Sequence, residues 1–210
     1  AFTARLSTLM AAQPGQTMLN AGTRASYEKG VRALLEHPGI RHLAGQEHSS
    51  NQAQPQLFQA DFSLLLEGDP LLQEEVFGPT TIVVEVTDSA ELHAALASLH
   101  GQLTATLIGE PHDLETYAGL LVLLEQKVGR VLFNGYPTGV QVCDAMVHGG
   151  PYPATSDARG TSVGTLAIDR FLRPVCYQNC PDSLLPQALQ NANPLGIERL
   201  VDGVSGRHAL

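Results

Sequence analysis

Three short runs of the sequence hold residue types that could bind and orient a small molecule. Paired carboxylates, Glu74 and Glu75, precede Phe77 and a Gly-Pro break. Further along, Asn134 stands before a glycine, and His148 stands before two glycines. A carboxylate is an acceptor matched to a vicinal diol, and an aromatic wall can hold a flat ring in one pose. These types could contact and orient a small molecule, or serve only as surface and turn residues.

The three cysteines are the candidate nucleophiles, because a thiolate can attack an electrophilic carbon. Only Cys143 lies in a glycine-rich region, whereas Cys176 and Cys180 follow all three runs. Each is also explained as a buried or incidental thiol, which is the interpretation we favour for all of them. An odd number of cysteines in a chain that is not rich in cysteine favours a reducing, cytoplasmic location.

Composition excludes several classes of protein. The chain has 210 residues, of which 43% are hydrophobic and 16% charged, as is typical of one or two ordinary globular domains. Its formal net charge is -9, and no cluster of Lys and Arg is present, so we expect no nucleic-acid partner. Apolar runs such as residues 120–124 are far shorter than the roughly 20 residues that span a bilayer, so we expect no membrane span.

The elements that must position the three runs alternate along the chain. β-branched and apolar residues predict strands at 80–86, 103–109 and 129–134, and helical periodicity predicts helices at 88–99 and 111–126. Crossover helices of this length join parallel strands. The sequence therefore predicts an α/β fold, with a doubly wound, mostly parallel sheet in which these three strands are neighbours.

Weaker signals describe the remainder of the chain. Before residue 80 we predict, in order, a helix over residues 2–13, a helix over 23–36 capped by Thr23 or Ser26, a polar loop over 42–55 and a strand over 57–66. After residue 134 we predict a long glycine-rich loop over 135–164, a helix or strand over 165–175 and a loosely packed polar tail from residue 181. Long loops of this kind carry function on a rigid scaffold.

The three runs resemble the signatures of one family. Residues 74–79, Glu-Glu-Val-Phe-Gly-Pro, resemble the Glu-Glu-Ile/Val-Phe-Gly-Pro signature of the aldehyde dehydrogenase superfamily. Residues 129–135 resemble the glycine, strand and asparagine segment of that family, and residues 148–152 its glycine-pair loop. Order and spacing agree in all three, and the resemblance extends over about residues 1–181. It implies the catalytic-domain fold of these enzymes, followed by a C-terminal oligomerisation segment.

Residues 148–155 and 161–164 are similar to the branch that contains 2-oxoglutarate semialdehyde and fatty-aldehyde dehydrogenases. Many other members carry Pro-Phe-Gly-Gly in the glycine-pair loop. The resemblance implies oxidation of an aldehyde, with 2-oxoglutarate semialdehyde as the candidate substrate, to a carboxylic acid through a cysteine thioester. It also implies NAD or NADP as cofactor.

The resemblance assigns roles to the residues of each run. Glu75 would hydrogen-bond the nicotinamide ribose hydroxyls, and Phe77 would pack near the nicotinamide ring. Without the motif, Glu74 is a solvated acid beside a turn and Phe77 is a core residue. The residues that would line the substrate pocket are Asn134, Cys143, His148, Gly149, Gly150 and Tyr152.

Each of these substrate-side assignments has a plain structural alternative. Asn134 follows a predicted parallel strand, where α/β folds place ligands, but Asn-Gly also simply forms turns. Gly149 and Gly150 are expected to adopt backbone conformations that other residues resist. His148 by itself is more often an exposed polar residue.

The resemblance also predicts what this chain lacks. Counting back from Glu75, the nucleophilic cysteine of the family would precede Ala1, and its general-base glutamate would lie earlier still. No Gly-x-Gly-x-x-Gly run is present. We therefore expect a partial catalytic domain at 1–164 and an oligomerisation strand with a tail at 165–210, inactive alone, whose partners are the N-terminal part of the same enzyme, an aldehyde and further copies of itself.

Two other classes of function are weighed beside this one. A fold does not fix a function, so the chain could be a stand-alone, non-catalytic α/β module for binding or assembly. A metal site is the other alternative, because eight histidines are present. The pairs His37 with His42 and His93 with His100 lack converging carboxylate or cysteine partners at ligand spacing, so we expect no metal.

Overall fold

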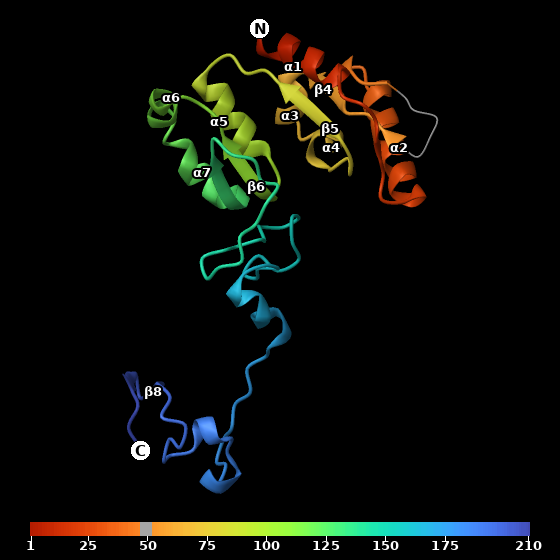
Figure 1. Cartoon of the computed structure of the whole chain (residues 1–210). Helices are drawn as coiled ribbons and strands as arrows, with labels where there is room; N and C mark the ends of the chain where they lie inside the picture. The colour runs from red at the N-terminus through yellow and green to blue at the C-terminus, as the bar shows by residue number, and fades with distance from the viewer. Residues whose placement is uncertain (47–51) are drawn as a thin grey trace. The chain divides into compact units, whose positions relative to one another are not determined.

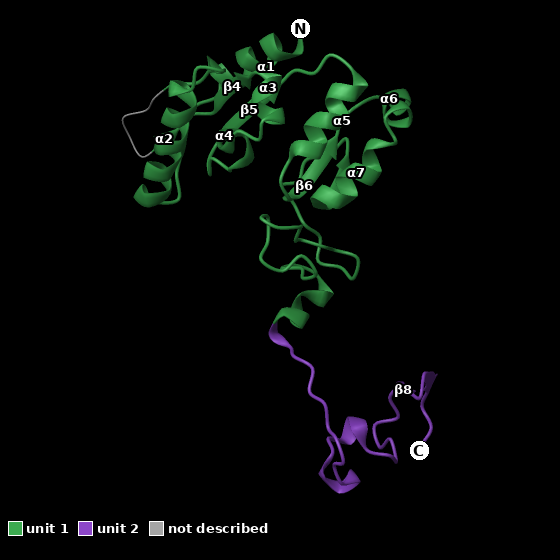
Figure 2. Ribbon diagram, turned by 180° about the vertical axis from the view of Figure 1, so that it is seen from behind, with its two compact units in different colours: residues 1–170 green, residues 171–210 purple. Residues whose placement is uncertain are grey.

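The computed structural model describes residues 1–46 and 52–210 and divides the chain into two compact units. Unit 1 is Ala1–Arg170 and unit 2 is Phe171–Leu210, shown in green and purple in Figure 2. All three runs of candidate site residues lie in unit 1.

Unit 1 alternates helices and strands along most of its length (Figure 1). In chain order its elements are α1 (Phe2–Ala11), β1 (Gln16–Thr17), α2 (Ala21–Glu36), β2 (Ile40–Ala44), β3 (Gln52–Ala53), β4 (Gln56–Ala60), α3 (Phe62–Leu66), α4 (Pro70–Gln73), β5 (Thr80–Val84), α5 (Ser89–Ser98), β6 (Gln102–Leu107), α6 (Pro111–Thr116), α7 (Leu120–Lys127), β7 (Val128–Phe133) and the 3-10 helix η1 (Thr165–Phe171). Parallel strand pairs joined by helices confirm the predicted α/β fold class.

The first sheet of unit 1 has the strand order β2-β4-β5, with β4 in the middle. β4 runs antiparallel to β2 and parallel to β5, so that Phe58 faces His42 on one side and Ile82 on the other. Leu57 and Phe58 are fully buried, as expected for a strand that is covered on both faces. The core of this sheet joins α2 to the strands and contains Tyr27, Val31, Leu34, Ile40, Ala53, Phe58 and Ala60.

The second sheet pairs β6 with β7 in parallel, with Leu107 opposite Phe133 at its C-terminal end. α5 and α7 contact each other, and α7 also contacts β7. Figures 1 and 2 show both helices beside this sheet. Asp88 begins α5 because its side chain accepts a hydrogen bond from the Glu91 amide at 2.9 Å, which satisfies a free helix N–H group.

Of the three strands predicted to be neighbours, only β6 and β7 are neighbours. β6 and β7 pair in parallel, but β5 pairs with β4 in the other sheet. The cause is β4, which overlaps the strand predicted at 57–66 and offers β5 a parallel partner along all five of its residues. No antiparallel pair joins β5, β6 and β7 among the described residues.

Three element boundaries also differ from prediction. The predicted strand at 57–66 is β4 followed by helix α3, because Asp61 ends the extended run. The predicted helix at 111–126 is divided into α6 and α7 around Gly119, a residue with low helix propensity. The predicted loop at 42–55 contains most of β2 and all of β3, while residues 47–51 lie outside the described part. Asn20, rather than Thr23 or Ser26, caps α2 by accepting from the Thr23 amide at 2.8 Å.

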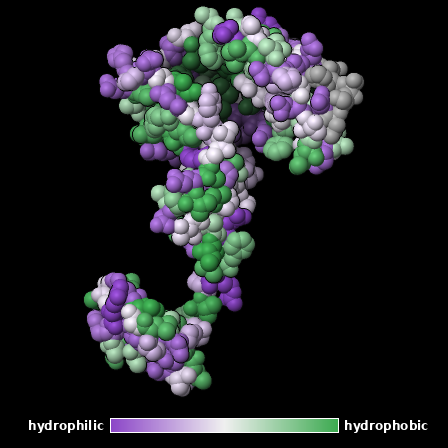
Figure 3. Space-filling model, in the orientation of Figure 1, coloured by the Kyte–Doolittle hydropathy of each residue, from purple (hydrophilic) through white to green (hydrophobic). Residues whose placement is uncertain are grey.

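After β7, residues 134–164 contain no helix or strand, as predicted for the long loop. Thr165–Phe171 then forms the 3-10 helix η1, and residues 172–178 have no regular structure, so the expected oligomerisation strand is not formed in this single chain. A strand needs a neighbouring strand to accept its backbone hydrogen bonds. Large apolar side chains lie on the surface in the stretch that follows β7 (Figure 3).

Unit 2 has local secondary structure but little packing, which agrees with the prediction of a loosely packed polar tail: within the described residues 171–210, Asn193 is the one buried residue. It contains the 3-10 helices η2 (Asp182–Leu184) and η3 (Gln187–Leu189) and the hairpin of β8 (Arg199–Val201) with β9 (Val204–Gly206). Buried Asn193 donates to the carbonyls of Ile197 and Arg207, at 2.9 and 2.7 Å. Polar contacts of this kind hold the unit together. In the part of the chain that the structure describes, no helix is both long and apolar enough to cross a membrane.

Candidate functional site

Residues 74–79 connect α4 to β5, and both ends of the connection are fixed. α4 starts at Pro70 because the Asp69 carboxylate accepts from the Leu71 amide at 2.8 Å. At the other end, the Gln56 amide donates to the Pro79 carbonyl at 2.8 Å. A Cβ at Gly78 would lie 2.3 Å from the Tyr27 ring, so only glycine fits beside that buried tyrosine.

Between these fixed ends, Glu75 and Phe77 point their functional groups outward. Glu74 and Glu75 are exposed, and within the described residues no hydrogen bond or ion pair occupies the Glu75 carboxylate. The Phe77 side chain is 64% exposed, so Phe77 is not a core residue. A carboxylate with free lone pairs and an exposed ring two residues away are the groups that could hold a diol and a flat ring.

Glu75 lines a cleft of about 1150 Å³ within unit 1. Its walls come from three places: α4 with the two glutamates, the connection between α5 and β6, and the end of the glycine-pair loop. The lining includes Gln73, Glu75, His100, Gly101 and Tyr152. The cleft therefore brings the carboxylate run and the glycine-pair loop to one place.

The two glycines of the loop are required by close packing of backbone on backbone. A Cβ at Gly149 would lie 2.5 Å from the Gly160 carbonyl oxygen, and one at Gly150 would lie 2.4 Å from that of Gln102. Neither glycine has a positive φ. The expectation that they adopt conformations other residues resist is therefore wrong, because space rather than φ excludes a side chain.

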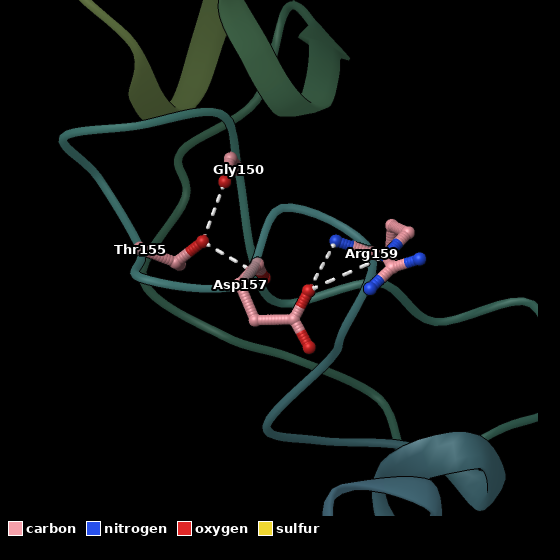
Figure 4. Close-up of polar contacts among 4 residues, drawn as sticks. All are labelled: Gly150, Thr155, Asp157 and Arg159. Carbon is pink, nitrogen blue, oxygen red and sulfur yellow. Dashed lines mark hydrogen bonds and ion pairs between the residues drawn. The ribbon is translucent and has the colours of Figure 1, made fainter.

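Polar contacts fix the shape of the loop further. The Thr155 hydroxyl donates to the Gly150 carbonyl at 2.6 Å and also approaches the Asp157 carbonyl at 3.1 Å (Figure 4). Asp157 in turn accepts from the Arg159 amide at 3.0 Å. The Asp157–Arg159 ion pair is mostly exposed and contributes little, so the backbone contacts carry the arrangement.

His148 and Tyr152, at the two ends of this loop, have different surroundings. The half-buried His148 donates its amide to the Thr161 hydroxyl at 2.8 Å, and its carbonyl accepts from Ser162 at 3.0 Å. Tyr152 is 82% exposed and lines the cleft. Tyr152 is therefore free to contact a ligand, whereas the His148 backbone is tied to the loop that follows.

Asn134 lies at the C-terminal end of β7 and is bound to the end of β6. Its φ of 49° is in the left-handed region, which asparagine tolerates. Its side chain accepts from the Gly109 amide at 2.9 Å and donates to the Gly109 carbonyl at 3.0 Å. Both the oxygen and the nitrogen of the side-chain amide are thus hydrogen-bonded to Gly109, which supports the alternative that Asn134 serves the turn after β7.

The structure separates Asn134 from the glycine-pair loop. Gly149 and Gly150 pack at the N-terminal ends of β7 and β6, whereas Asn134 lies at the C-terminal ends. Five steps of about 3.3 Å place the two ends of β6 roughly 17 Å apart. Of the predicted substrate-side residues, only Tyr152 joins Glu75 in the cleft.

Sequence reasoning missed two side chains that shape the site. Gln73 is buried beside the cleft, and Arg130 donates to the carbonyls of Pro137 and Gly139 at 2.9 Å each. Arg130 thus holds the first part of the loop that contains Cys143. A polar residue in a helix or strand is ordinarily exposed, so no signal in the sequence marks either one.

Among the described residues, the cysteines and histidines form no centre of their own. Cys143 and Cys180 are half-buried free thiols, and Cys176 is exposed in unit 2. Over residues 1–46 and 52–210, no three His, Cys, Asp or Glu side chains converge as metal ligands. The Nε2 atom of His37 lies 3.3 Å from the Asp69 carboxylate.

Several known proteins are similar to this chain. No protein-family model matches the chain. The chain is 58% identical over 204 residues to a protein named alpha-ketoglutaric semialdehyde dehydrogenase from Acinetobacter baylyi, and this match covers 96% of the chain and 39% of that protein. It is 48% identical to alpha-ketoglutaric semialdehyde dehydrogenase 2 from Azospirillum brasilense, over 92% of the chain and 37% of that protein. The chain thus spans less than half the length of these relatives.

Solved structures share the fold. A lactaldehyde dehydrogenase matches 82% of the chain, and the chain covers 36% of it, with a TM-score of 0.59 and 18% identity. An NAD-dependent benzaldehyde dehydrogenase from Corynebacterium glutamicum matches 64% of the chain, and the chain covers 30% of it, with a TM-score of 0.51 and 15% identity. In its sequence relatives and in its fold, the chain is similar to part of the aldehyde dehydrogenases.

Proposed function

We propose that the intact protein is an NAD(P)-dependent aldehyde dehydrogenase that oxidises alpha-ketoglutaric semialdehyde to the carboxylic acid. The observation that carries the proposal is the 58% identity to a protein of that name across 96% of the chain. The cleft between the carboxylate run and the glycine-pair loop supports it, because both motifs contribute to one concave surface.

The residues of the carboxylate run fit the nicotinamide end of a dinucleotide. When bound, the cofactor supplies the hydride acceptor. The Glu75 carboxylate has free lone pairs on the cleft wall and would accept hydrogen bonds from the ribose hydroxyls. The exposed ring of Phe77, two residues away, would cover one face of the nicotinamide. The choice between NAD and NADP belongs to groups that would hold the adenosine end.

The glycine-pair loop would form the substrate side. Its backbone is held at both glycines, so the exposed Tyr152 is presented from a rigid support. In the proposed arrangement His148 and Cys143 lie on the same loop region, and Asn134 fixes its start to the end of β6. The proposed role of Asn134 is therefore to shape the wall rather than to touch the aldehyde.

The test of the cofactor assignment is Glu75→Gln in the intact enzyme, with Glu74→Gln as the matched control. Loss of a hydrogen bond to a charged acceptor costs roughly 1.5 to 3 kcal/mol, so the dissociation constant of NADH or NADPH should rise about tenfold or more. Glu74→Gln removes the neighbouring exposed carboxylate and should leave affinity within about twofold. Unchanged cofactor affinity and hydride-transfer rate in Glu75→Gln would show that the assigned role is wrong.

We further propose that none of the three cysteines of this chain is the nucleophile. Oxidation of the aldehyde requires a positioned thiolate that adds to the carbonyl carbon before hydride leaves, and water then releases the acid from the thioester. Cys143 is half-buried in the loop that follows β7, and Cys176 and Cys180 lie in unit 2. The isolated 210-residue chain should show no reduction of NAD or NADP with short or long aldehydes. Turnover that disappears in Cys143→Ala would overturn this.

Exposed apolar side chains at residues 171–175 support a proposal about assembly. Phe171, Leu172 and Val175 are each more than half exposed, and exposed apolar side chains in such a row favour contact with another copy. We propose a homo-oligomeric, cytoplasmic enzyme. Sedimentation of the intact enzyme should give a dimer or larger species, and a strict monomer would contradict the proposed assembly.

A further inference from the structure

We propose that Gln73 is a positioning residue that holds Glu75 at its place on the cleft wall. The inference rests on the proposed function, because it takes Glu75 as the acceptor for the nicotinamide ribose. Gln73 is the last residue of α4, two residues before Glu75.

Both ends of the Gln73 side-chain amide are engaged across the cleft. Its oxygen accepts from the His100 amide at 2.9 Å, and its nitrogen donates to the Ser98 carbonyl at 3.3 Å. The residue is only 9% exposed. A buried amide with both groups paired fixes its own backbone position, because moving it would leave buried polar groups unpaired.

Gln73 contacts the connection between α5 and β6, and two further contacts fix that connection. The Lys127 ammonium donates to the carbonyls of Ala97 and Leu99, each at 2.7 Å. At Gly101, a Cβ would lie 2.3 Å from the Pro151 carbonyl oxygen, so the backbones of Gly101 and the glycine-pair loop are in direct contact. The connection between α5 and β6 is therefore a fixed support against which Gln73 can hold α4.

Glu75 has no such support of its own. Within the described residues its carboxylate makes no hydrogen bond or ion pair, so its place depends on the backbone that leaves α4. The Val76 side chain that follows would lie 2.9 Å from a Cβ at Gly30, which anchors the far side of Glu75 against α2. Gln73 anchors the near side. The carboxylate is thus presented between two fixed points, one of which is the buried amide.

The test measures cofactor binding by the intact enzyme through the fluorescence of NADH and NADPH. Gln73→Met keeps the length of the side chain and removes both hydrogen bonds, and we expect the dissociation constant of the preferred cofactor to rise about tenfold. Gln126→Met, at an exposed position on α7, is the matched control and should change it less than twofold. The KM for cofactor should follow the dissociation constant, while kcat at saturating cofactor stays within about threefold.

A double-mutant cycle decides whether Gln73 acts through Glu75. If it does, Gln73→Met combined with Glu75→Gln should bind cofactor within about twofold of Glu75→Gln alone. If the double variant instead shows the product of the two single-variant increases in the cofactor dissociation constant, the inference is wrong. It is also wrong if the dissociation constant of Gln73→Met lies within twofold of the wild-type value.

The same cycle separates this inference from the proposed function. A normal loss in Glu75→Gln together with an unchanged Gln73→Met would remove the positioning role alone, whereas an unchanged Glu75→Gln would remove both. If Gln73→Met does not fold, as judged by thermal unfolding, Gln73→Glu replaces it. That variant keeps the acceptor for the His100 amide and loses the donor to Ser98, and it must show the same non-multiplicative loss.

Discussion

Gly129→Ala should show how much the close packing of β7 against the glycine-pair loop contributes to stability. A Cβ at this position would lie 2.0 Å from the Gly149 carbonyl oxygen and 2.6 Å from its carbonyl carbon. Ordinary contact begins at 3.4 Å, so one backbone must move by about 1.4 Å, the difference between 3.4 and 2.0 Å. Both neighbours are backbone atoms, so no side chain can rotate away to make room.

Overpacking of this kind costs roughly 1 to 3 kcal/mol, and we expect about 2 kcal/mol because β7 and the glycine-pair loop are both fixed. For a chain of this length each kcal/mol corresponds to about 2 to 4 °C, so the melting temperature should fall by about 4 to 8 °C. Hydrogen exchange should also accelerate in the peptide that contains residues 148–152.

Gly119→Ala is the matched control, because it makes the same chemical change in open space. No atom lies within 4 Å of a Cβ at Gly119, and its φ of -61° is helical. That variant should be stabilised by about 0.4 to 1 kcal/mol through the lower entropy of its unfolded chain. A stability of Gly129→Ala within 0.5 kcal/mol of the wild type, with unchanged exchange in 148–152, would refute the contact and the rigid support inferred from it.

Two further predictions concern single hydrogen-bonding residues. Burial raises the pKa of Tyr27 above its usual value, so above about pH 10 the unfolded chain ionises first and stability should fall as pH rises. Tyr27→Phe loses the hydrogen bond to the Gln54 carbonyl and should lower the free energy of unfolding by about 1 kcal/mol at pH 8, measured by urea denaturation. It should also remove most of the fall in stability between about pH 10 and higher pH. An unchanged fall would contradict the prediction. Asn134→Ala should cost about 2 kcal/mol, because alanine resists a φ of 49° and both Gly109 contacts are lost. Asn134→Gly loses the same contacts but should cost distinctly less in the same assay, because glycine tolerates that φ. Equal losses of stability in the two variants would argue against backbone strain.

The sequence alone predicted the local elements and the family. Asp88 before α5 and the β-branched run of β5 are signals carried by neighbours a few residues apart, so they can be read without the fold. The same is true of the long loop after β7 and of the motifs at residues 74–79, 129–135 and 148–152, whose order indicated an aldehyde dehydrogenase. Where a local signal is ambiguous, as over residues 57–66, the prediction of a single strand was wrong.

Only the tertiary structure decided which of these elements meet. It paired β5 with β4 rather than with β6, and it placed Asn134 and the glycine-pair loop at opposite ends of β6 and β7. It also showed that Gly150 is needed for close packing rather than for φ, and that Gln73 is buried and bridged to the α5–β6 connection. The physical reason is common to all of them: each depends on atoms that come from distant parts of the chain, and a residue's type does not specify which distant backbone will lie within 3 Å of it.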